Sequence, residues 1–225
     1  MEAEEMLHRV VTQLRQVPWR TVFVGGSVTH RLITDPGAPR PPATTDVDVV
    51  IDIASRAVYS VELRAFLRQI GGKEDSREGA PLCRWILDSV TCDIMPTDAT
   101  VLGFSNPWYS DAIQTAVVAR SHELEFRLVN APHFIATKIS AFASRGGRDF
   151  LGSKDIEDIL AVVDGRPELL AEIQDTGSRL RSFLSDTFNE WLEVDTFKYA
   201  VEGYLKSDPP RVDLLFKRLR QLTRK

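Results

Sequence analysis

Two aspartates, Asp46 and Asp48, stand one residue apart in the apolar stretch DVDVVIDI at residues 46–53. The stretch alternates with a period of two, as β-strands do, so both carboxylates are expected to project from one face. Burying such a pair requires protonation of one member or a divalent cation, and hard oxygen ligands suit Mg²⁺ or Mn²⁺. We therefore expect a metal site here. Asp52 is left out, because an exposed acid at a strand end is unremarkable.

A second pattern lies upstream, where the apolar run TVFV at residues 21–24 is followed by Gly25, Gly26 and Ser27. Glycines let the backbone approach a ligand closely, and Ser27 is expected to cap a following helix and to donate to a phosphate oxygen. Free N–H groups at a helix start favour an anion. This pattern is common by itself, but together with Asp-x-Asp on the next strand it indicates a phosphate site.

A third acid, Asp93, lies alone among apolar residues in VTCDIMP at residues 90–96. It is the natural candidate to complete a metal site with the first two aspartates. A hairpin turning at Asp88-Ser89 would place Arg84 opposite Asp93, so a simple cross-strand ion pair is the alternative. Both interpretations stay open at this point.

The elements that must position these residues form two halves, residues 1–125 and residues 126–225. Alternating strand and helix patterns in the first half predict an α/β (α+β) fold, a mixed sheet with flanking helices, and the second half is helical to the end. The expected strands cover 21–24, 46–53, a hairpin within 83–95, and a pair near 116–120 and 124–131. The expected helices cover 3–16, a start at 27, then 55–72, 106–116, 131–145, 153–165, 167–186, 188–204 and a last one after 210.

Composition indicates a globular protein, with 225 residues, 43% hydrophobic and 27% charged. The N-terminal stretch has no signal-peptide pattern and no apolar run is long enough to cross a bilayer, so we expect a cytoplasmic protein without a membrane partner. The hairpin register leaves Cys83 and Cys92 unpaired, so no disulfide is expected. The four histidines have no metal-ligand spacing, which argues against zinc.

The net charge of −4 gives no global attraction to nucleic acid, but the charge is uneven. The last segment is strongly basic, which indicates either a local phosphate-binding face or charges that complement a helix dipole. Its basic residues are Arg211, Lys217, Arg218, Arg220, Arg224 and Lys225.

These patterns together resemble the nucleotidyltransferase superfamily over about the first 120 residues. The resemblance implies a nucleotidyltransferase-type sheet and transfer of a nucleotide from a nucleoside triphosphate to an acceptor hydroxyl, with release of pyrophosphate. Eighteen residues separate Ser27 from Asp46, more than is usual in the family, and we interpret the surplus at 35–43 as a loop insertion. The implied roles are Mg²⁺ binding by Asp46 and Asp48, completion of the site or base action by Asp93, and triphosphate binding by Gly25, Gly26 and Ser27.

The helical half narrows the resemblance. Lys138 and Arg145 lie on one helical face, and Asp155 and Asp158 begin the next helix. A solvated lysine and a dipole-favoured acid are the plain explanation. The pattern is also similar to the C-terminal motifs of AbiEii-like nucleotidyltransferases, including MenT-type toxins of type IV toxin-antitoxin systems.

This likeness implies that Lys138 and Arg145 contact nucleotide phosphates and that Asp155 or Asp158 is needed for activity. It further implies a tRNA 3′ acceptor end as substrate, with Arg145, Arg148 and the basic tail on its backbone. A cognate antitoxin protein or antitoxin kinase would be the partner.

Two alternatives remain. A small-molecule acceptor, as in aminoglycoside or lincosamide nucleotidyltransferases, agrees with the negative net charge, because cationic drugs prefer acidic clefts. A non-catalytic nucleotide-binding module would be expected to have lost an acid of the Asp-x-Asp pair, and both are present.

Overall fold

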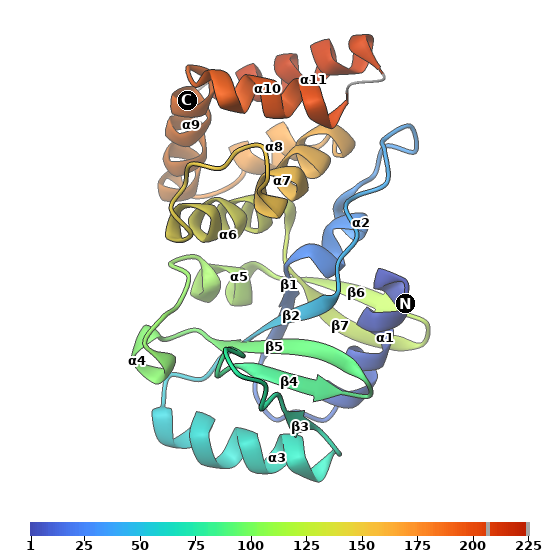
Figure 1. Ribbon diagram of the computed structural model, residues 1–225, viewed down its shortest axis with the longest axis vertical. Helices are drawn as coiled ribbons and strands as arrows, with labels where there is room; N and C mark the ends of the chain where they lie inside the picture. Colours follow the sequence, from blue (N-terminus) through green and yellow to red (C-terminus); the bar gives the residue numbers. More distant parts are fainter. Residues whose placement is uncertain (206–207, 224–225) are drawn as a thin grey trace. The chain divides into compact units, whose positions relative to one another are not determined.

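The computed structural model describes residues 1–205 and 208–223 (Figure 1). The chain divides into two compact units. The sheet unit comprises Met1–Val28 and Ala43–Asn130, and the helical unit comprises Thr29–Pro42 and the chain from Ala131 onward. Among the described residues, no helix is both long and apolar enough to cross a membrane.

The sheet unit is built on one mixed sheet of the expected α/β class. Within the described residues the sheet has seven strands in the order β3-β4-β5-β2-β1-β7-β6. The strands are β1 Thr21–Val24, β2 Asp46–Ile51, β3 Lys73–Glu74, β4 Arg84–Leu87, β5 Val90–Pro96, β6 Val117–Ser121 and β7 Leu124–Leu128. The helices are α1 Ala3–Leu14, the 3₁₀ turn η1 Gly26–Val28, the π-helix η2 Val58–Leu63, α3 Arg64–Gln69, α4 Ala99–Leu102 and α5 Tyr109–Thr115.

The centre of the sheet is where the sequence alternates most clearly. Strand β2 pairs antiparallel with β1 and parallel with β5. Its Val47 and Val49 are fully buried, while Asp46 and Asp48 on the other face are half-buried. Asp52 lies beyond the end of β2 and is exposed, as expected. One face of this strand therefore supplies core and the other presents carboxylates.

The β4–β5 hairpin has the predicted turn and register. Asp88 and Ser89 both adopt positive φ, 46° and 66°, as a two-residue hairpin turn requires. Trp85 faces Cys92, so this cysteine and Cys83 remain free, and both are buried. Burial raises the pKa of the Cys83 thiol to about 12. The expectation of no disulfide is confirmed.

Helices of the helical unit differ from expectation in one place. The helix predicted at 167–186 is wrong: it is two helices, because Asp175–Gly177 interrupts the apolar period, with the Thr176 hydroxyl donating to the Ile173 carbonyl. Consequently the helix expected at 188–204 begins only at Asp195. The helices are α2 Thr29–Leu32, α6 Ala131–Ser144, α7 Lys154–Gly165, α8 Leu169–Gln174, α9 Ser178–Leu192, α10 Asp195–Tyr204 and α11 Pro209–Leu222.

The proline-rich segment 35–43 has no helix or strand, as expected for a loop. Its first residues are fixed within the helical unit. The Asp35 N–H donates to the Gly165 carbonyl at 2.9 Å. Arg211 of α11 donates to the Asp35 carboxylate at 2.9 Å and to the Gly37 carbonyl at 2.8 Å. The loop is therefore tied at its start by one arginine.

The same arginine neutralises a buried acid. Arg211 Nε donates to both oxygens of Asp164, at 2.8 and 2.9 Å, and the Asp164 side chain is fully buried. Burial raises the pKa of Asp164, and the hydrogen bonds from Arg211 oppose that rise. Arg211 thus neutralises a buried acid of the helical unit and does not contribute to a basic surface. Two members of the basic tail, Arg224 and Lys225, lie outside the described residues.

Replacing this arginine should destabilise the fold in a pH-dependent way. Arg211→Met leaves Asp164 buried without its cation, so we expect the free energy of unfolding at neutral pH to fall by about 3 kcal/mol. The loss should shrink as the pH falls through the raised pKa of Asp164, because a protonated carboxyl needs no counter-ion. Urea unfolding at neutral pH and at a pH below the pKa of Asp164 measures this loss of stability. The exposed Lys217→Met variant is the control. An equal loss at both pH values would contradict the assignment.

Candidate functional site

Three aspartates of the sheet unit share one face of two neighbouring strands. Strands β2 and β5 are parallel neighbours in the sheet (Figure 1). Their register places Asp48 directly beside Asp93. Asp46 precedes Asp48 by two residues and so lies on the same face. The Asp93 side chain is 12% exposed and that of Asp46 is 31% exposed. The structure therefore brings together the three acids that the sequence selected.

Arg84 of β4 continues this row of charges. Its Nε and Nη2 donate to the two oxygens of Asp93 at 2.8 and 2.7 Å, and Nη2 lies 3.5 Å from Asp46 Oδ2. Hydrogen bonding to Asp93 raises the pKa of the Arg84 guanidinium. The cross-strand ion pair foreseen as an alternative for Asp93 is thus formed, and it also reaches the first aspartate of the Asp-x-Asp pair.

The glycine turn is built against the second aspartate. Gly25 has φ of +71°, a region that favours glycine, and a Cβ placed on it would stand 1.8 Å from Asp48 Oδ2. The carboxylate occupies the space that any other residue's side chain would need. Gly25 therefore lets the backbone lie close to the Asp48 carboxylate. The Gly-Gly-Ser turn and the Asp-x-Asp strand are in contact at this point.

Ser27 does not have the predicted capping role. It lies inside the 3₁₀ turn η1, not ahead of a helix, and the α-helix that follows has only four residues. A helix this short adds little dipole at its start, so that part of the anion argument weakens. Ser27 is fully buried, and among the described residues its Oγ has no hydrogen-bond partner. Burying a hydroxyl in this way costs about 1 to 3 kcal/mol, so the site keeps an unsatisfied polar atom.

The acid row has the chemistry of a divalent-cation site. Asp46 and Asp48 offer carboxylate oxygens from one face of a rigid strand, and Thr44 donates to Asp46 Oδ1 at 3.1 Å, which orients that carboxylate. Across residues 1–205 and 208–223, no three His, Cys, Asp or Glu side chains are grouped closely enough to hold a metal as they stand. Within the row, Asp93 directs both oxygens to Arg84. The donor pair fits a hard cation, and the third acid has a competing partner.

A second charged cluster lies within the helical unit. Lys138 of α6 is 3.2 Å from Asp155 Oδ1 and 2.6 Å from Asp158 Oδ2, both on α7. All three side chains are at least 88% buried, since the lysine is 12% exposed and the aspartates 4% and 5%. Arg145, which follows α6, lies 2.5 Å from the other oxygen of Asp155 and is exposed. The plain expectation of a solvated lysine is therefore wrong, and the four predicted residues do meet.

Thr29 belongs to this cluster and was missed by sequence reasoning. Its hydroxyl donates to Asp158 Oδ1 at 3.0 Å, and it is fully buried. Thr29 follows Ser27 by two residues, so the chain passes directly from the glycine turn into the lysine cluster. No local signal set Thr29 apart from its polar neighbours, because its partner lies 129 residues away in the sequence.

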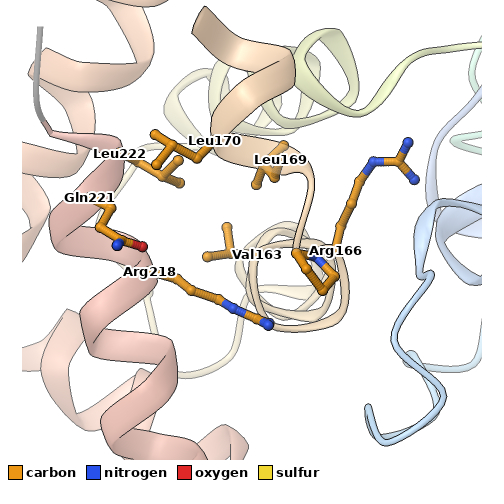
Figure 2. Close-up of a pocket in the computed structure, with 8 residues that line it drawn as sticks. Val163, Arg166, Leu169, Leu170, Arg218, Gln221 and Leu222 are labelled. Carbon is orange, nitrogen blue, oxygen red and sulfur yellow. The ribbon is translucent and has the colours of Figure 1, made fainter.

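The helical unit also has a hollow of about 300 Å³ that contains none of the predicted site residues. Figure 2 shows the Arg166 side chain pointing away from the other labelled side chains. Its guanidinium donates to the Glu172 carboxylate and to the Leu32 carbonyl. The Arg166 charge is thus already neutralised by Glu172, and Arg218, which also lines the hollow, donates to the Asp164 carbonyl. The lining residues are Val163, Arg166, Pro167, Leu169, Leu170, Arg218, Gln221 and Leu222.

Comparisons with known proteins bear on the fold. No protein-family model matches the chain, and no curated protein does. Among solved structures it is similar to the crystal structure of an antigenic nucleotidyltransferase-like protein from Paracoccidioides brasiliensis, with a TM-score of 0.56 and 18% identity over 98% of this chain and 93% of that one. At this identity the likeness establishes the fold, which is nucleotidyltransferase-like.

Proposed function

We propose that this chain, which folds like a nucleotidyltransferase, transfers a nucleotide from a nucleoside triphosphate to an acceptor hydroxyl and releases pyrophosphate. The observation that carries the proposal is the fit of Gly25 against Asp48. A Cβ at Gly25 would lie 1.8 Å from the carboxylate, so a phosphate-type turn and an Asp-x-Asp strand are built as one site. A purely structural strand would not need two acids beside a glycine turn.

In this proposal Asp46 and Asp48 hold Mg²⁺ or Mn²⁺, and Asp93 completes the metal site. When bound, the cation would polarise the α-phosphate and stabilise the leaving pyrophosphate. The buried Ser27 hydroxyl, which has no hydrogen-bond partner in residues 1–205 and 208–223, would donate to a phosphate oxygen, while Gly25 and Gly26 admit the polyphosphate close to the backbone. The acceptor oxygen forms its bond to the α-phosphorus as the bond to pyrophosphate breaks, and Asp93 would accept the hydroxyl proton.

The lysine cluster has a separate part in the proposal. Asp155 and Asp158 hold the Lys138 ammonium in one place within the helical unit. A cation fixed in this way is suited to bind phosphate without losing further side-chain freedom. From the likeness to AbiEii-like and MenT-type toxins we assign Lys138 and the exposed Arg145 to phosphate binding, and the two aspartates to positioning Lys138.

The acceptor is proposed from the sequence likeness to AbiEii-like and MenT-type toxins. It would be the 3′ acceptor end of tRNA, and modification would block aminoacylation. A cognate antitoxin protein or antitoxin kinase would restrain the enzyme. Arg145 and Arg148 are exposed, as are Lys217 and Arg220 of α11, so cationic side chains are available for an RNA backbone despite the net charge of −4.

The decisive test supplies four α-³²P-labelled nucleoside triphosphates in turn, with Mg²⁺, to the whole protein with total tRNA or with a panel of aminoglycosides. Label on tRNA that is absent with Asp48→Asn supports the proposal in full. Label on a drug keeps the reaction and replaces the acceptor. Asp52→Asn is the matched control, because this exposed aspartate lies two residues beyond Val50 on the same segment and should retain full activity. If the wild-type chain labels nothing and binds no nucleotide, the proposal fails.

A further inference from the structure

Arg84 is placed where a metal would have to compete with it. Its guanidinium makes a two-pronged contact with Asp93, at 2.8 and 2.7 Å, and its Nη2 is 3.5 Å from Asp46. The register across three strands puts Arg84, Asp93 and Asp48 side by side, on β4, β5 and β2. One arginine thus contacts two of the three acids proposed to serve one cation.

This arrangement differs from the other ion pairs of the sheet unit. Arg77 pairs with Asp75 of its own loop, and that arginine is 72% exposed. Arg84 is 24% exposed and Asp93 12% exposed, so their contact is sheltered from water and from salt. A sheltered, bidentate guanidinium is a strong competitor for a carboxylate.

The charges of the row also indicate that Arg84 would change partners when a cation binds. The row contains three carboxylates and one guanidinium, a formal charge of −2 that a single divalent cation would balance. A cation bound by Asp46, Asp48 and Asp93 needs oxygens that Arg84 now contacts. The guanidinium would then require a new anionic partner, and a polyphosphate brought to the same face is one.

We infer that Arg84 is a built-in competitor of the divalent cation: it occupies Asp93 and reaches Asp46 until metal and polyphosphate arrive together, and it then transfers to the phosphate. This inference rests on the proposed function. It gives Arg84 two roles: to withhold the third acid from metal alone, and to contact the polyphosphate once metal has bound.

Mn²⁺ binding, measured by electron paramagnetic resonance of the free ion, tests this without any reaction. Arg84→Gln should tighten Mn²⁺ binding at least tenfold. The same substitution in an Asp93→Asn background should change it less than twofold, because the contested carboxylate is gone. Arg77→Gln is the matched control, since it removes one positive charge of the same unit without contact to the row, and its affinity should stay within twofold of wild type.

A second measurement follows the guanidinium itself. The ¹⁵N–¹H signal of Arg84 Nε is identified by its absence from the spectrum of Arg84→Gln. Its chemical shift should change when Mg²⁺ and inorganic tripolyphosphate are added together, and should stay unchanged when Mg²⁺ is added alone. Should Arg84→Gln fold poorly, Arg84→Lys keeps the charge but not the two-pronged contact, and an intermediate Mn²⁺ affinity is expected.

The outcomes separate the two proposals. If wild-type protein binds Mn²⁺, Asp48→Asn abolishes that binding and Arg84→Gln leaves it unchanged or weaker, then the competitor role is overturned while the proposed function stands. If neither wild type nor Arg84→Gln binds Mn²⁺, the metal-dependent function falls and the competitor role falls with it.

Discussion

Gly25→Ala is expected to remove nucleotide transfer, by at least about 100-fold, and to lower the free energy of unfolding by about 3 kcal/mol. The new Cβ would lie 1.8 Å from Asp48 Oδ2, so either the turn or the carboxylate must move. Of the stability loss, about 1 to 2 kcal/mol comes from forcing an L-residue to φ of +71°. Urea unfolding and the labelled-nucleotide assay measure the two effects.

Gly71→Ala separates backbone strain from the clash. Gly71 has φ of +86°, yet nothing lies within 4 Å of the position its Cβ would take. Gly71→Ala should lose only the part of the free energy of unfolding that comes from forcing an L-residue to positive φ, and it should keep its activity. The double variant Gly25→Ala/Asp48→Ala should recover only part of the steric loss, because the Cβ that alanine keeps at position 48 would still lie 2.7 Å from the new Cβ, and it should remain inactive. If Gly25→Ala keeps wild-type activity, the close approach of turn and carboxylate has no part in the reaction.

Lys138→Met should be among the most destabilising single changes in the helical unit. Removing the lysine leaves Asp158, which is 5% exposed, without its lysine, and leaves Asp155, which is 4% exposed, with Arg145 as its remaining partner. Breaking a buried pair in this way costs about 3 to 5 kcal/mol, and urea unfolding at neutral pH would measure it. Lys198→Met is the matched control, because Lys198 also pairs with an aspartate of the helical unit but is 39% exposed, and it should cost less than about 1 kcal/mol.

A further variant distinguishes the structural role of the cluster from the proposed role in nucleotide binding. Lys138→Met/Asp155→Asn/Asp158→Asn removes all three charges, so most of the stability should return. Under the proposed function this variant still fails to bind nucleotide. A stable triple variant with wild-type nucleotide affinity would leave the cluster a purely structural role.

The features that the sequence predicted correctly are those set by short-range rules. Period-two alternation placed Asp46 and Asp48 on one face of β2, and the Asp88-Ser89 turn fixed the pairing of Arg84 with Asp93. Helical spacing placed Lys138 and Arg145 on one side, and both contact Asp155. Each of these depends on residues that are neighbours on one element or across one tight turn.

The features that the sequence did not predict depend on contacts between distant segments or on weak breaks. Asp175–Gly177 interrupts an apolar period that otherwise continues from α8 into α9, and only three polar residues mark the break. The bond from Thr29 to Asp158 spans 129 residues. The clash that a Cβ at Gly25 would have with Asp48 likewise depends on how the two strands pair.

The course of the chain through its two units limits how this protein can be divided. Because Thr29–Pro42 belongs to the helical unit although it lies between two parts of the sheet unit, no single cut yields either unit whole. A gene fragment ending at residue 130 would encode Asp35 without Arg211, and Thr29 without Asp158. A truncation or fusion made at the apparent domain junction therefore removes contacts that lie within the helical unit. Each unit therefore needs both of its chain segments, and the whole chain has to be expressed together.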